Sequence, residues 1–198
     1  MLISLVSTQT SSLGRQHYSF GQSPNNAVTI SNSYINGQTS HSASCDGHTY
    51  WGLELVGSGD EITFYKNYLY YTSGRSPALS GTTLFHAVNN VFSSNSGHLI
   101  EGGSTGGQGL FEGNYFEDIT TVLDSGYSGV LFSAASDNLS TCSSYLGRDC
   151  VANTYSGSDE LTGDDTSFLS QFSGQNIPEA EDVSSIQSSV VSSAGNTL

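Results

Sequence analysis

The sequence predicts an all-β fold, a solenoid in which short parallel strands wind into a β-helix. Two observations indicate this architecture: an asparagine recurs with a period in the low twenties, and apolar residues follow it at a constant offset. Composition is the third, because only 11% of the residues are charged and Ser, Thr, Asn and Gly are abundant. Helical proteins instead place Glu, Lys and Ala on exposed faces. The 198 residues are enough for one domain with a sizeable core, which we expect to span residues 1–198.

The repeat is a β-rich run, then an asparagine, then an apolar or aromatic pair. Its four copies are VTISNSYI around Asn32, ITFYKNYLY around Asn67, LFHAVNNVF around Asn90 and LFEGNYF around Asn114. The last three asparagines are 23 and 24 residues apart, whereas the first interval is 35 residues. That longer interval predicts one period plus an insertion, which would hold His41, Cys45 and the pair Tyr50-Trp51.

A period of this length is typical of one solenoid turn. A leucine-rich repeat has a similar length, but its L-x-x-L-x-L ladder is absent from the sequence. In a parallel β-helix, equivalent residues stack about 4.8 Å apart, so an asparagine at each bend can hydrogen-bond to the coils above and below. The alternative is four ordinary turn-then-strand signals; the matching period favours the ladder.

Two stacked core columns are expected beside the asparagines. One precedes the ladder and contains Ile30, Ile62, Leu84 and Leu110; the other follows it by two residues and contains Tyr34, Leu69, Phe92 and Phe116. After about residue 125 the repeat fades, so residues 125–198 are interpreted as C-terminal loops and a tail packing on the helix. In that tail, Asp165 or Thr166 can cap a short helical run, while SSIQSSVVSSAG is equally compatible with a strand and a weak helix.

The charge balance restricts the partners. Four cations, Arg15, Lys66, Arg75 and Arg148, face 18 carboxylates, which gives a formal net charge of −14. Nucleic acid and anionic membrane are excluded as expected partners because phosphate binding needs clustered Lys and Arg. A neutral polymer suits this surface better. No apolar run approaches the length of a membrane span, the start of the chain lacks the basic region of a signal peptide, and we expect a monomer.

The three cysteines predict one disulfide. Cys142 and Cys150 lie eight residues apart in CSSYLGRDC, a spacing that suits a short disulfide loop, with two free thiols as the alternative. Cys45 is then left over, which suggests a free thiol, an intermolecular bond or a partner outside this chain. Asn138-Leu139-Ser140 is a glycosylation sequon, so a glycoprotein is expected.

Five segments carry a resemblance to a known family: GRQHY (14–18), CDGHTYWGLEL (45–55), SGRSP (73–77), LFHAVNNVF (84–92) and CSSYLGRDC (142–150). In order and spacing they resemble fungal pectin lyases over essentially the whole chain from about residue 10. The resemblance implies a secreted right-handed parallel β-helix that cleaves methyl-esterified polygalacturonate, or pectin, by β-elimination without calcium or another cofactor. It also implies more chain before GRQH, with a signal peptide, early coils, an essential aspartate and the partner of Cys45. We therefore expect this sequence to be truncated, to lack those coils and to have impaired activity as a result.

The resemblance assigns the chemistry to two arginines. Arg75, in SGRSP, would take the C5 proton of the substrate, and Arg15, in GRQH, would stabilise the developing oxyanion. Arginine normally has a pKa above 12, so a base role requires desolvation and neighbouring positive charge. The repeat places both arginines at a similar phase two coils apart, about 10 Å along the axis. Ala78 departs from the family motif SGRSPK, which removes a lysine beside the expected base.

Three further residues are assigned to substrate binding. Tyr50 and Trp51 can stack on a sugar face, with a place in the core as the alternative. His17 belongs to the GRQH motif, and a structural role is its alternative. His86 and His98 are interpreted as hydrogen-bonding residues of the helix wall, and no zinc or calcium spacing is present in the sequence. Two other functions stay open, a non-catalytic β-helix that binds polysaccharide and a calcium-dependent pectate lyase.

Overall fold

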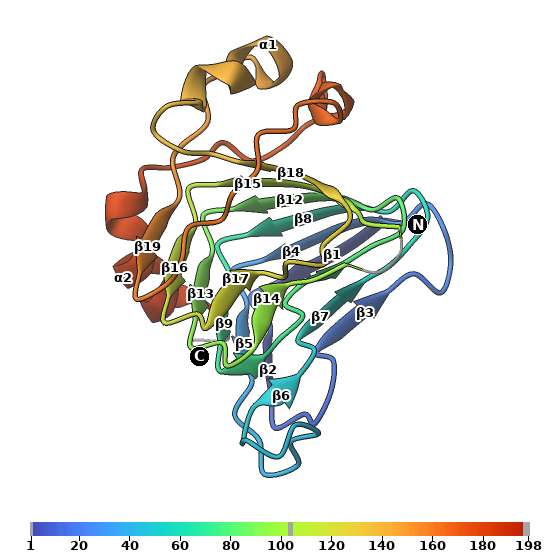
Figure 1. Ribbon diagram of the computed structural model, residues 1–198, viewed down its shortest axis with the longest axis vertical. Helices are drawn as coiled ribbons and strands as arrows, with labels where there is room; N and C mark the ends of the chain where they lie inside the picture. The colour runs from blue at the N-terminus through green and yellow to red at the C-terminus, as the bar shows by residue number, and fades with distance from the viewer. Residues whose placement is uncertain (1, 103–104, 196–198) are drawn as a thin grey trace.

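The computed structural model describes residues 2–102 and 105–195, which form a stack of parallel strands with helical segments on the outside (Figure 1). Two sheets of six strands each make two walls of the solenoid within this part of the chain. The ladders between successive coils are parallel in both sheets. The predicted all-β parallel β-helix is therefore confirmed.

The two long walls alternate along the chain. The first sheet contains β1 (Leu2–Val6), β4 (Ala27–Ser31), β8 (Glu61–Tyr65), β12 (Leu84–Val88), β15 (Gln108–Glu112) and β18 (Val130–Ser133). The second contains β2 (Gln9–Ser11), β5 (Tyr34–Asn36), β9 (Tyr68–Tyr70), β13 (Val91–Ser93), β16 (Tyr115–Glu117) and β19 (Thr154–Ser156). Buried and exposed positions alternate along most of these strands, because successive side chains point to opposite faces.

The third wall consists of shorter pairings. A three-stranded sheet contains β3 (Tyr18–Phe20), β7 (Leu53–Leu55) and β11 (Ala78–Leu79). Two separate pairs are β6 (Thr49–Tyr50) with β10 (Thr72–Ser73), and β14 (His98–Ile100) with β17 (Thr121–Leu123). A parallel bridge between Ala78 and Glu101 connects the coil of β11 to that of β14.

The asparagine ladder runs along the bend between the two long sheets. The backbone N–H of Asn67 donates to Oδ1 of Asn90 at 2.9 Å, and Asn90 donates in the same way to Asn114. Each amide nitrogen also bonds to the next amide oxygen, at 3.0–3.1 Å. Asn153 continues the ladder by one coil, and all four side chains are buried. The ladder thus satisfies the backbone groups that the bend removes from water.

The prediction that Asn32 belongs to this ladder is wrong by one position. The N–H that donates to Oδ1 of Asn67, at 3.0 Å, is that of Ser33. Asn32 instead precedes the ladder, as Lys66 and Asn89 do, and all three residues have left-handed backbone with φ of 50–53°. Asparagine tolerates that conformation as well as forming ladders, so its identity alone does not reveal which role it has.

The expected column behind the ladder is confirmed in its main part. Leu69, Phe92 and Phe116 stack in register and are fully buried, and the rings of Phe92 and Phe116 lie 5.1 Å apart. The first member is Ile35, which pairs with Leu69, and not Tyr34. Tyr34 points outward and stacks on Tyr68, because the register of this coil follows Ser33.

The other expected column, of Ile30, Ile62, Leu84 and Leu110, does not form in the structure. Ile30 stacks on Phe64, whereas Ile62 belongs to the neighbouring column. Leu84 and Leu110 point to the outer face of the first sheet, where the C-terminal segment buries them in a second cluster. Both faces of β12 are therefore buried, which removes the alternation that identifies inward positions.

The solenoid continues beyond residue 125, where the repeat was expected to fade. β18 pairs with β15, and β19 pairs with β16, so the segment interpreted as an outer loop contributes a strand. Asn153 lies 39 residues after Asn114, because a long excursion of the chain between β18 and β19 lengthens this coil and hides the period. The excursion contains the disulfide between Cys142 and Cys150. The rest of the tail packs outside the strands (Figure 1).

The excursion and tail contain the helices: η1 (Leu139–Cys142), α1 (Ser143–Leu146), η2 (Leu169–Phe172), η3 (Val183–Ser185) and α2 (Ile186–Ser193). The predicted helical run is η2, and Asp165 accepts a hydrogen bond from the N–H of Ser167 just before it. The ambiguous segment SSIQSSVVSSAG contains α2, whose Ile186 and Val190 pack on Val91. No helix in the described ranges is long and apolar enough to cross a membrane.

Candidate active site

The third wall brings the two predicted arginines together through Trp51. Arg15 forms a bridge with Tyr50, and Tyr50 pairs with Ser73 of the next coil, so the expected separation of two coils is confirmed. The guanidinium carbon of Arg75 lies 3.8 Å from the centre of the Trp51 ring, and that of Arg15 lies 4.7 Å from it. Arg15 is also 5.3 Å from the Tyr50 ring. Contacts of this kind stabilise a cation by about 0.5–2 kcal/mol.

A strained bend directs these side chains outward. Gln16, Trp51 and Arg75 have φ of 29°, 62° and 44°, in the left-handed region that residues other than glycine rarely adopt. Backbone bonds hold the bend between coils: Leu53 N–H donates to the carbonyl of Arg75, and Arg75 N–H donates to that of His98. Strain of this type accumulates at functional sites, where the surrounding coils maintain it.

Three side chains that the sequence did not identify as site residues form a series of contacts that begins at Arg75. Glu101 Oε2 accepts a hydrogen bond from Arg75 Nε at 2.6 Å. His98 Nδ1 lies 3.5 Å from Glu101 and 3.4 Å from Asp124. Because Nε is occupied, the ion pair fixes the plane of the guanidinium and directs its terminal nitrogens away from Glu101. The coil period could have placed Glu101 near Arg75, since the two residues are 26 apart.

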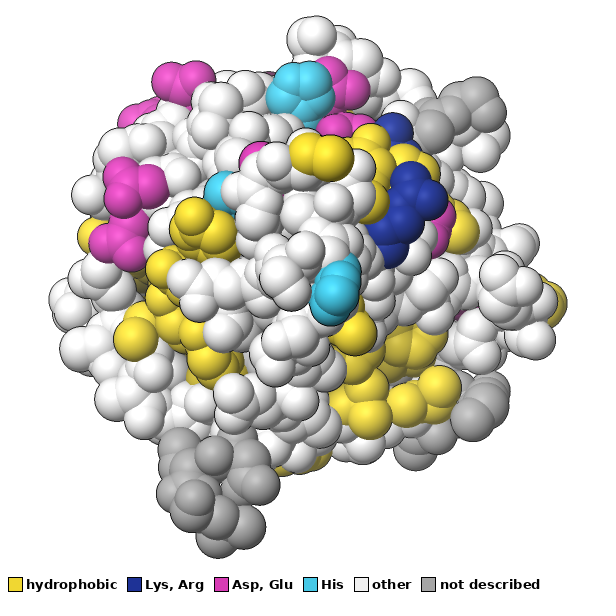
Figure 2. Space-filling view, turned by 90° about the horizontal axis from the view of Figure 1, so that it is seen from below, with side chains coloured by type: hydrophobic (Ala, Val, Ile, Leu, Met, Phe, Trp, Pro, Cys, Tyr) yellow, Lys and Arg dark blue, Asp and Glu magenta, His cyan; other side chains and the backbone are white. Residues whose placement is uncertain are grey.

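A cavity of about 170 Å³ opens next to Arg75. Glu54, Glu101 and Ala78 are among the residues that line it. Glu54 is held by Gln16, whose Nε2 donates to Oε2 at 2.8 Å. Figure 2 shows the basic side chains of this face gathered in one group beside hydrophobic side chains. The cavity therefore combines one cation with two carboxylates.

The structure places His17 inside the wall, which corrects its expected role as a substrate contact. Its side chain is buried, Nδ1 bonds to the hydroxyl of Thr10 at 2.8 Å, and Nε2 bonds to that of Thr49 at 3.2 Å. Burial lowers the pKa of His17 to about 4. A neutral imidazole with both nitrogens occupied supports the strand beneath the arginines and does not reach a ligand.

Trp51 and Tyr50 lie on the wall itself and not in the insertion where we expected them. The insertion is the loop between β5 and β6, with Cys45 exposed and unpaired. In that loop Asp46 accepts hydrogen bonds from Ser42 and Ser44, which hold its pKa well below the usual range against the opposing effect of burial. Trp51 is half-buried, and its Nε1 has no hydrogen-bond partner in the described part of the chain.

The other two cations have structural roles. Arg148 binds Glu112 through both terminal nitrogens, at 2.7 and 2.8 Å, and also donates to the carbonyl of Pro178. Burial alone would raise the pKa of Glu112, but hydrogen bonds from Arg148 and His86 outweigh it and lower the pKa to about 2. Lys66 pairs with Glu181 of the tail. Only Arg15 and Arg75 of the four cations contact the site.

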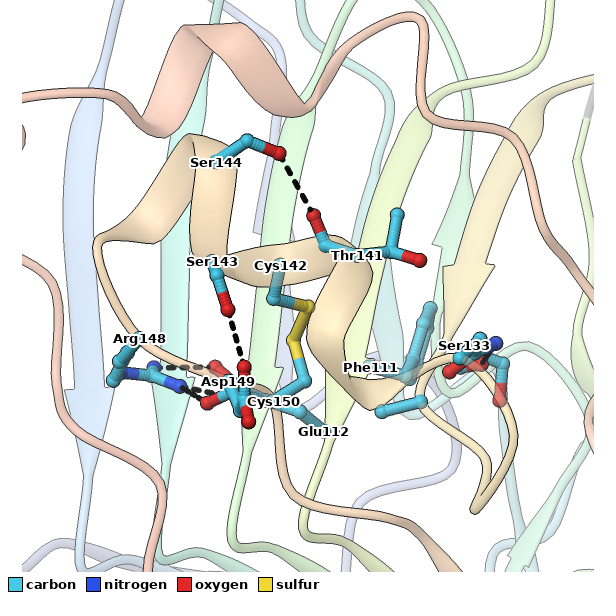
Figure 3. The surroundings of a disulfide bond; sticks show 12 residues. Phe111, Glu112, Ser133, Thr141, Cys142, Ser143, Ser144, Arg148, Asp149 and Cys150 are labelled. Atoms are coloured by element: carbon cyan, nitrogen blue, oxygen red, sulfur yellow. Dashed lines mark hydrogen bonds and ion pairs between the residues drawn. A yellow bond between two sulfur atoms is a disulfide. The ribbon is translucent and has the colours of Figure 1, made fainter.

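The predicted disulfide between Cys142 and Cys150 is present, with the two Cα atoms 5.5 Å apart (Figure 3). It closes the excursion that carries Arg148 onto Glu112. In the same excursion, Asn138 Nδ2, the atom that would carry a glycan, donates to the carbonyl of Ser133 at 3.0 Å. No group of three or more His, Cys, Asp or Glu side chains that could hold a metal occurs in residues 2–102 and 105–195.

Known proteins share both the sequence and the fold of this chain. The family model described as pectate lyase matches residues 21–195. The chain belongs to the pectate lyase family. It is 64% identical over 189 residues to probable pectin lyase E of Aspergillus niger, covering 96% of this chain and 51% of that protein. It is 50% identical over 190 residues to pectin lyase A of Emericella nidulans, covering 96% of this chain and 50% of the relative. The chain thus spans about half the length of these relatives.

A solved structure supports the fold independently. The crystal structure of pectate lyase Bsp165PelA from Bacillus sp. N165 in complex with trigalacturonate aligns with a TM-score of 0.57 over 97% of this chain and 67% of the other. At 12% identity, this similarity concerns the architecture only. The stacking of coils is therefore shared by proteins with little sequence identity.

Proposed function

We propose that this chain carries the arginine half of a pectin lyase site and acts on methyl-esterified α-1,4-polygalacturonan by β-elimination. The observation that carries the proposal is the contact of Arg75 and Arg15 with one indole ring, beside a cavity that Arg75 lines. High identity to pectin lyases over 96% of the chain supports the same chemistry.

The reaction needs a base and a stabilised oxyanion. Arg75 removes the C5 proton, the electron pair of that bond forms the C4–C5 double bond, and the C4–O glycosidic bond breaks. The departing oxygen takes up a proton, which leaves one unsaturated and one ordinary chain end. Arg15 stabilises the negative charge that develops on the ester carbonyl oxygen. Methyl esterification helps because it removes the carboxylate charge that would oppose proton loss at C5.

The surroundings of Arg75 fit this division of roles. Arg15 contacts the same indole ring as Arg75, so the two guanidinium groups are proposed to act on one sugar unit. Glu101 fixes the orientation of Arg75 through Nε, so a terminal nitrogen is the atom that would receive the proton. Glu54 and Glu101 also repel an unesterified uronate, which favours the methyl ester.

Tyr50 and Trp51 are proposed to contact the sugar. Both rings are half-buried and stand 5.0 Å apart at the edge of the arginine group. An aromatic face packs well against the C–H side of a neutral pyranose. Since Trp51 already contacts both guanidinium groups and Tyr50 contacts only that of Arg15, Tyr50 is the better candidate for the stacking surface.

The product assay distinguishes this proposal from its alternatives. Methylated and de-esterified polygalacturonan are each supplied to the chain with calcium and with a chelator, and unsaturated product is followed by ultraviolet absorbance. Pectin lyase activity predicts product from the methylated polymer in the presence of chelator. Product only from de-esterified polymer with calcium would identify a pectate lyase. Retained pectin binding without product would identify a non-catalytic binding protein.

The same proposal includes the setting in which the protein works. A pectin substrate and a disulfide between Cys142 and Cys150 both fit an extracellular protein, because disulfides persist in oxidising compartments. The net charge of −14 makes nucleic acid and anionic membranes poor partners. We propose that the protein acts as a monomer without a cofactor.

A further inference from the structure

Two columns of residues run along the third wall at the arginine site. In the first column, the backbone N–H of Arg75 donates to the carbonyl of His98 at 2.7 Å, so these two residues occupy neighbouring coils. In the second column, Ala78 is bridged to Glu101, and Asp124 comes one coil later, directly after β17, the partner of β14. The coils that follow Arg75 therefore bring an imidazole and two carboxylates to its side.

Glu101 is shared between the two residues of the first column. Its Oε2 accepts a hydrogen bond from Arg75 Nε at 2.6 Å, and its Oε1 lies 3.5 Å from His98 Nδ1. The side chain of Glu101 is only 19% exposed. A carboxylate that is held at one oxygen loses rotational freedom, which also fixes its other oxygen. The contact with His98 therefore acts on the hydrogen bond between Glu101 and Arg75.

The contacts of His98 depend on the charge of its imidazole. Nδ1 lies 3.4 Å from Asp124 and 3.5 Å from Glu101, and neither approach is a hydrogen bond within the described residues. A third carboxylate, Asp46, reaches the segment before His98 through Ser96, whose Oγ donates to Oδ2 at 2.8 Å. The attraction between His98 and these carboxylates is ionic, so it exists while the imidazole is protonated. Histidine is the side chain that ordinarily gains or loses this charge between about pH 5 and 8.

We propose that His98 is a positioning residue of the arginine site, whose protonated imidazole holds Glu101 in the orientation that fixes Arg75. This inference rests on the proposed elimination, because it concerns the transfer of the C5 proton to a terminal nitrogen of Arg75. A protonated His98 keeps Oε1 of Glu101 in place, and Oε2 then sets the plane of the guanidinium. A neutral His98 releases Oε1, so Arg75 is less well oriented and proton transfer is slower.

The test compares the elimination rates of the unmodified chain, His98→Gln and His98→Lys from about pH 5 to pH 8. Unsaturated product from methylated pectin is measured with chelator, and the rate without protein is subtracted at each pH. Ratios taken at one pH cancel the pH dependence that the substrate and Arg75 contribute to all three proteins. His98→Gln removes the charge at every pH, whereas His98→Lys keeps a cation throughout the range.

We expect the kcat of the unmodified chain to exceed that of His98→Gln about threefold at about pH 5 and to equal it at about pH 8, because an exposed ion pair contributes up to about fivefold. KM should not change, since His98 acts through Glu101. His98→Lys should keep the advantage at the upper end of the range. His41→Gln, in the insertion loop, is the matched control, because this exposed histidine lies outside both columns. A ratio to His98→Gln that stays constant across the range would overturn the proposal, as would loss of the His98→Lys advantage at high pH.

A spectroscopic readout separates this proposal from the proposed function. The NMR signal of the Arg75 Nε–H, assigned with Arg75→Lys, reports the bond to Glu101 whether or not product forms. We expect this signal to shift between about pH 5 and 7.5 in the unmodified chain and to stay constant in His98→Gln. Such a shift without product at any pH would contradict the elimination alone and support the positioning role. A shift that persists in His98→Gln, or no shift in the unmodified chain, would overturn the role of His98.

Discussion

Replacing Asn90 by alanine removes the central member of the asparagine ladder. Its Nδ2 donates to the carbonyl of Phe64 at 2.7 Å and to Asn114, and its Oδ1 accepts from the N–H and the amide of Asn67. In Asn90→Ala the amides of Asn67 and Asn114 keep other partners, the Phe64 carbonyl loses one donor, and the buried N–H of Asn67 loses its acceptor. One buried backbone N–H is then left unpaired and further hydrogen bonds are lost.

The unpaired N–H costs about 1–3 kcal/mol and the other lost hydrogen bonds about 1 kcal/mol each, so the expected loss of unfolding free energy is about 4 kcal/mol. That is a large part of the 5–15 kcal/mol typical of a domain, and it corresponds to a fall in Tm of about 8–16 °C for a chain of this size. Urea unfolding followed by circular dichroism measures it. Asn36→Ala is the control, because Asn36 makes one local bond on the surface and should cost less than about 0.5 kcal/mol. A loss below about 1 kcal/mol in Asn90→Ala would refute the role of the ladder.

Four further predictions concern pH, the disulfide and the site. The pKa of Glu112 is lowered from 4.5 to about 2, so its stabilisation is complete above pH 4.5 and is lost as pH falls towards 2; the difference in unfolding free energy between the unmodified chain and Glu112→Gln should shrink by about 3 kcal/mol over that range. The pKa of His17 is lowered from 6.5 to about 4, so acidification from pH 6.5 to 4 should destabilise the protein by up to about 3 kcal/mol, and His17→Asn should remove that slope in the same titration. Replacing Cys142 and Cys150 by serine opens a short loop and should cost about 2–3 kcal/mol, read as a lower urea midpoint, and an unchanged midpoint would show that the excursion is held by Arg148 alone. Glu101→Gln should lower the elimination rate about tenfold through misorientation of Arg75 while leaving the urea midpoint unchanged, and an unaltered rate would argue against its positioning role.

The fold was predictable to the extent that a period of one coil is visible in the sequence. Asn67, Asn90 and Asn114 stand in coils of nearly equal length, and their ladder was found with the column of Leu69, Phe92 and Phe116 behind it. In coils with insertions, the ladder residues were predicted less accurately. In the first coil, Asn32 was predicted to be the ladder residue, but it is the left-handed residue that precedes the ladder. In the last coil, the excursion between β18 and β19 hid Asn153.

The outward-facing residues show a second limit of sequence patterns. Leu84 and Leu110 look like core residues because they are apolar, and they are buried, but on the outside of the sheet beneath the tail. An apolar residue in a strand shows that it is covered and does not show from which side. The contact of a distant segment with a sheet face leaves no periodic signal in the sequence.

The site was predictable in its cations and not in its carboxylates. Arg15 and Arg75 are conspicuous because the chain has only four basic residues, and the coil period placed them two coils apart. Glu101 is one of 18 acidic residues, and the coil period that brings it near Arg75 does not by itself distinguish it from the other carboxylates. The expected role of His17 as a substrate contact was wrong because successive side chains in a strand point to opposite faces. The motif alone does not show whether a residue points outward or into the wall.

The elimination assay with Arg75→Ala tests most directly whether the arginine pair is the working site. Unsaturated product from methylated pectin is measured in the presence of chelator for the unmodified chain, for Arg75→Ala and for Lys66→Ala, which removes one positive charge from the bend between β8 and β9. We predict product from the unmodified chain and from Lys66→Ala, and none from Arg75→Ala with an unchanged urea midpoint. Equal product from Arg75→Ala, or none from any of the three, would contradict the assignment of the reaction to Arg75 in this chain.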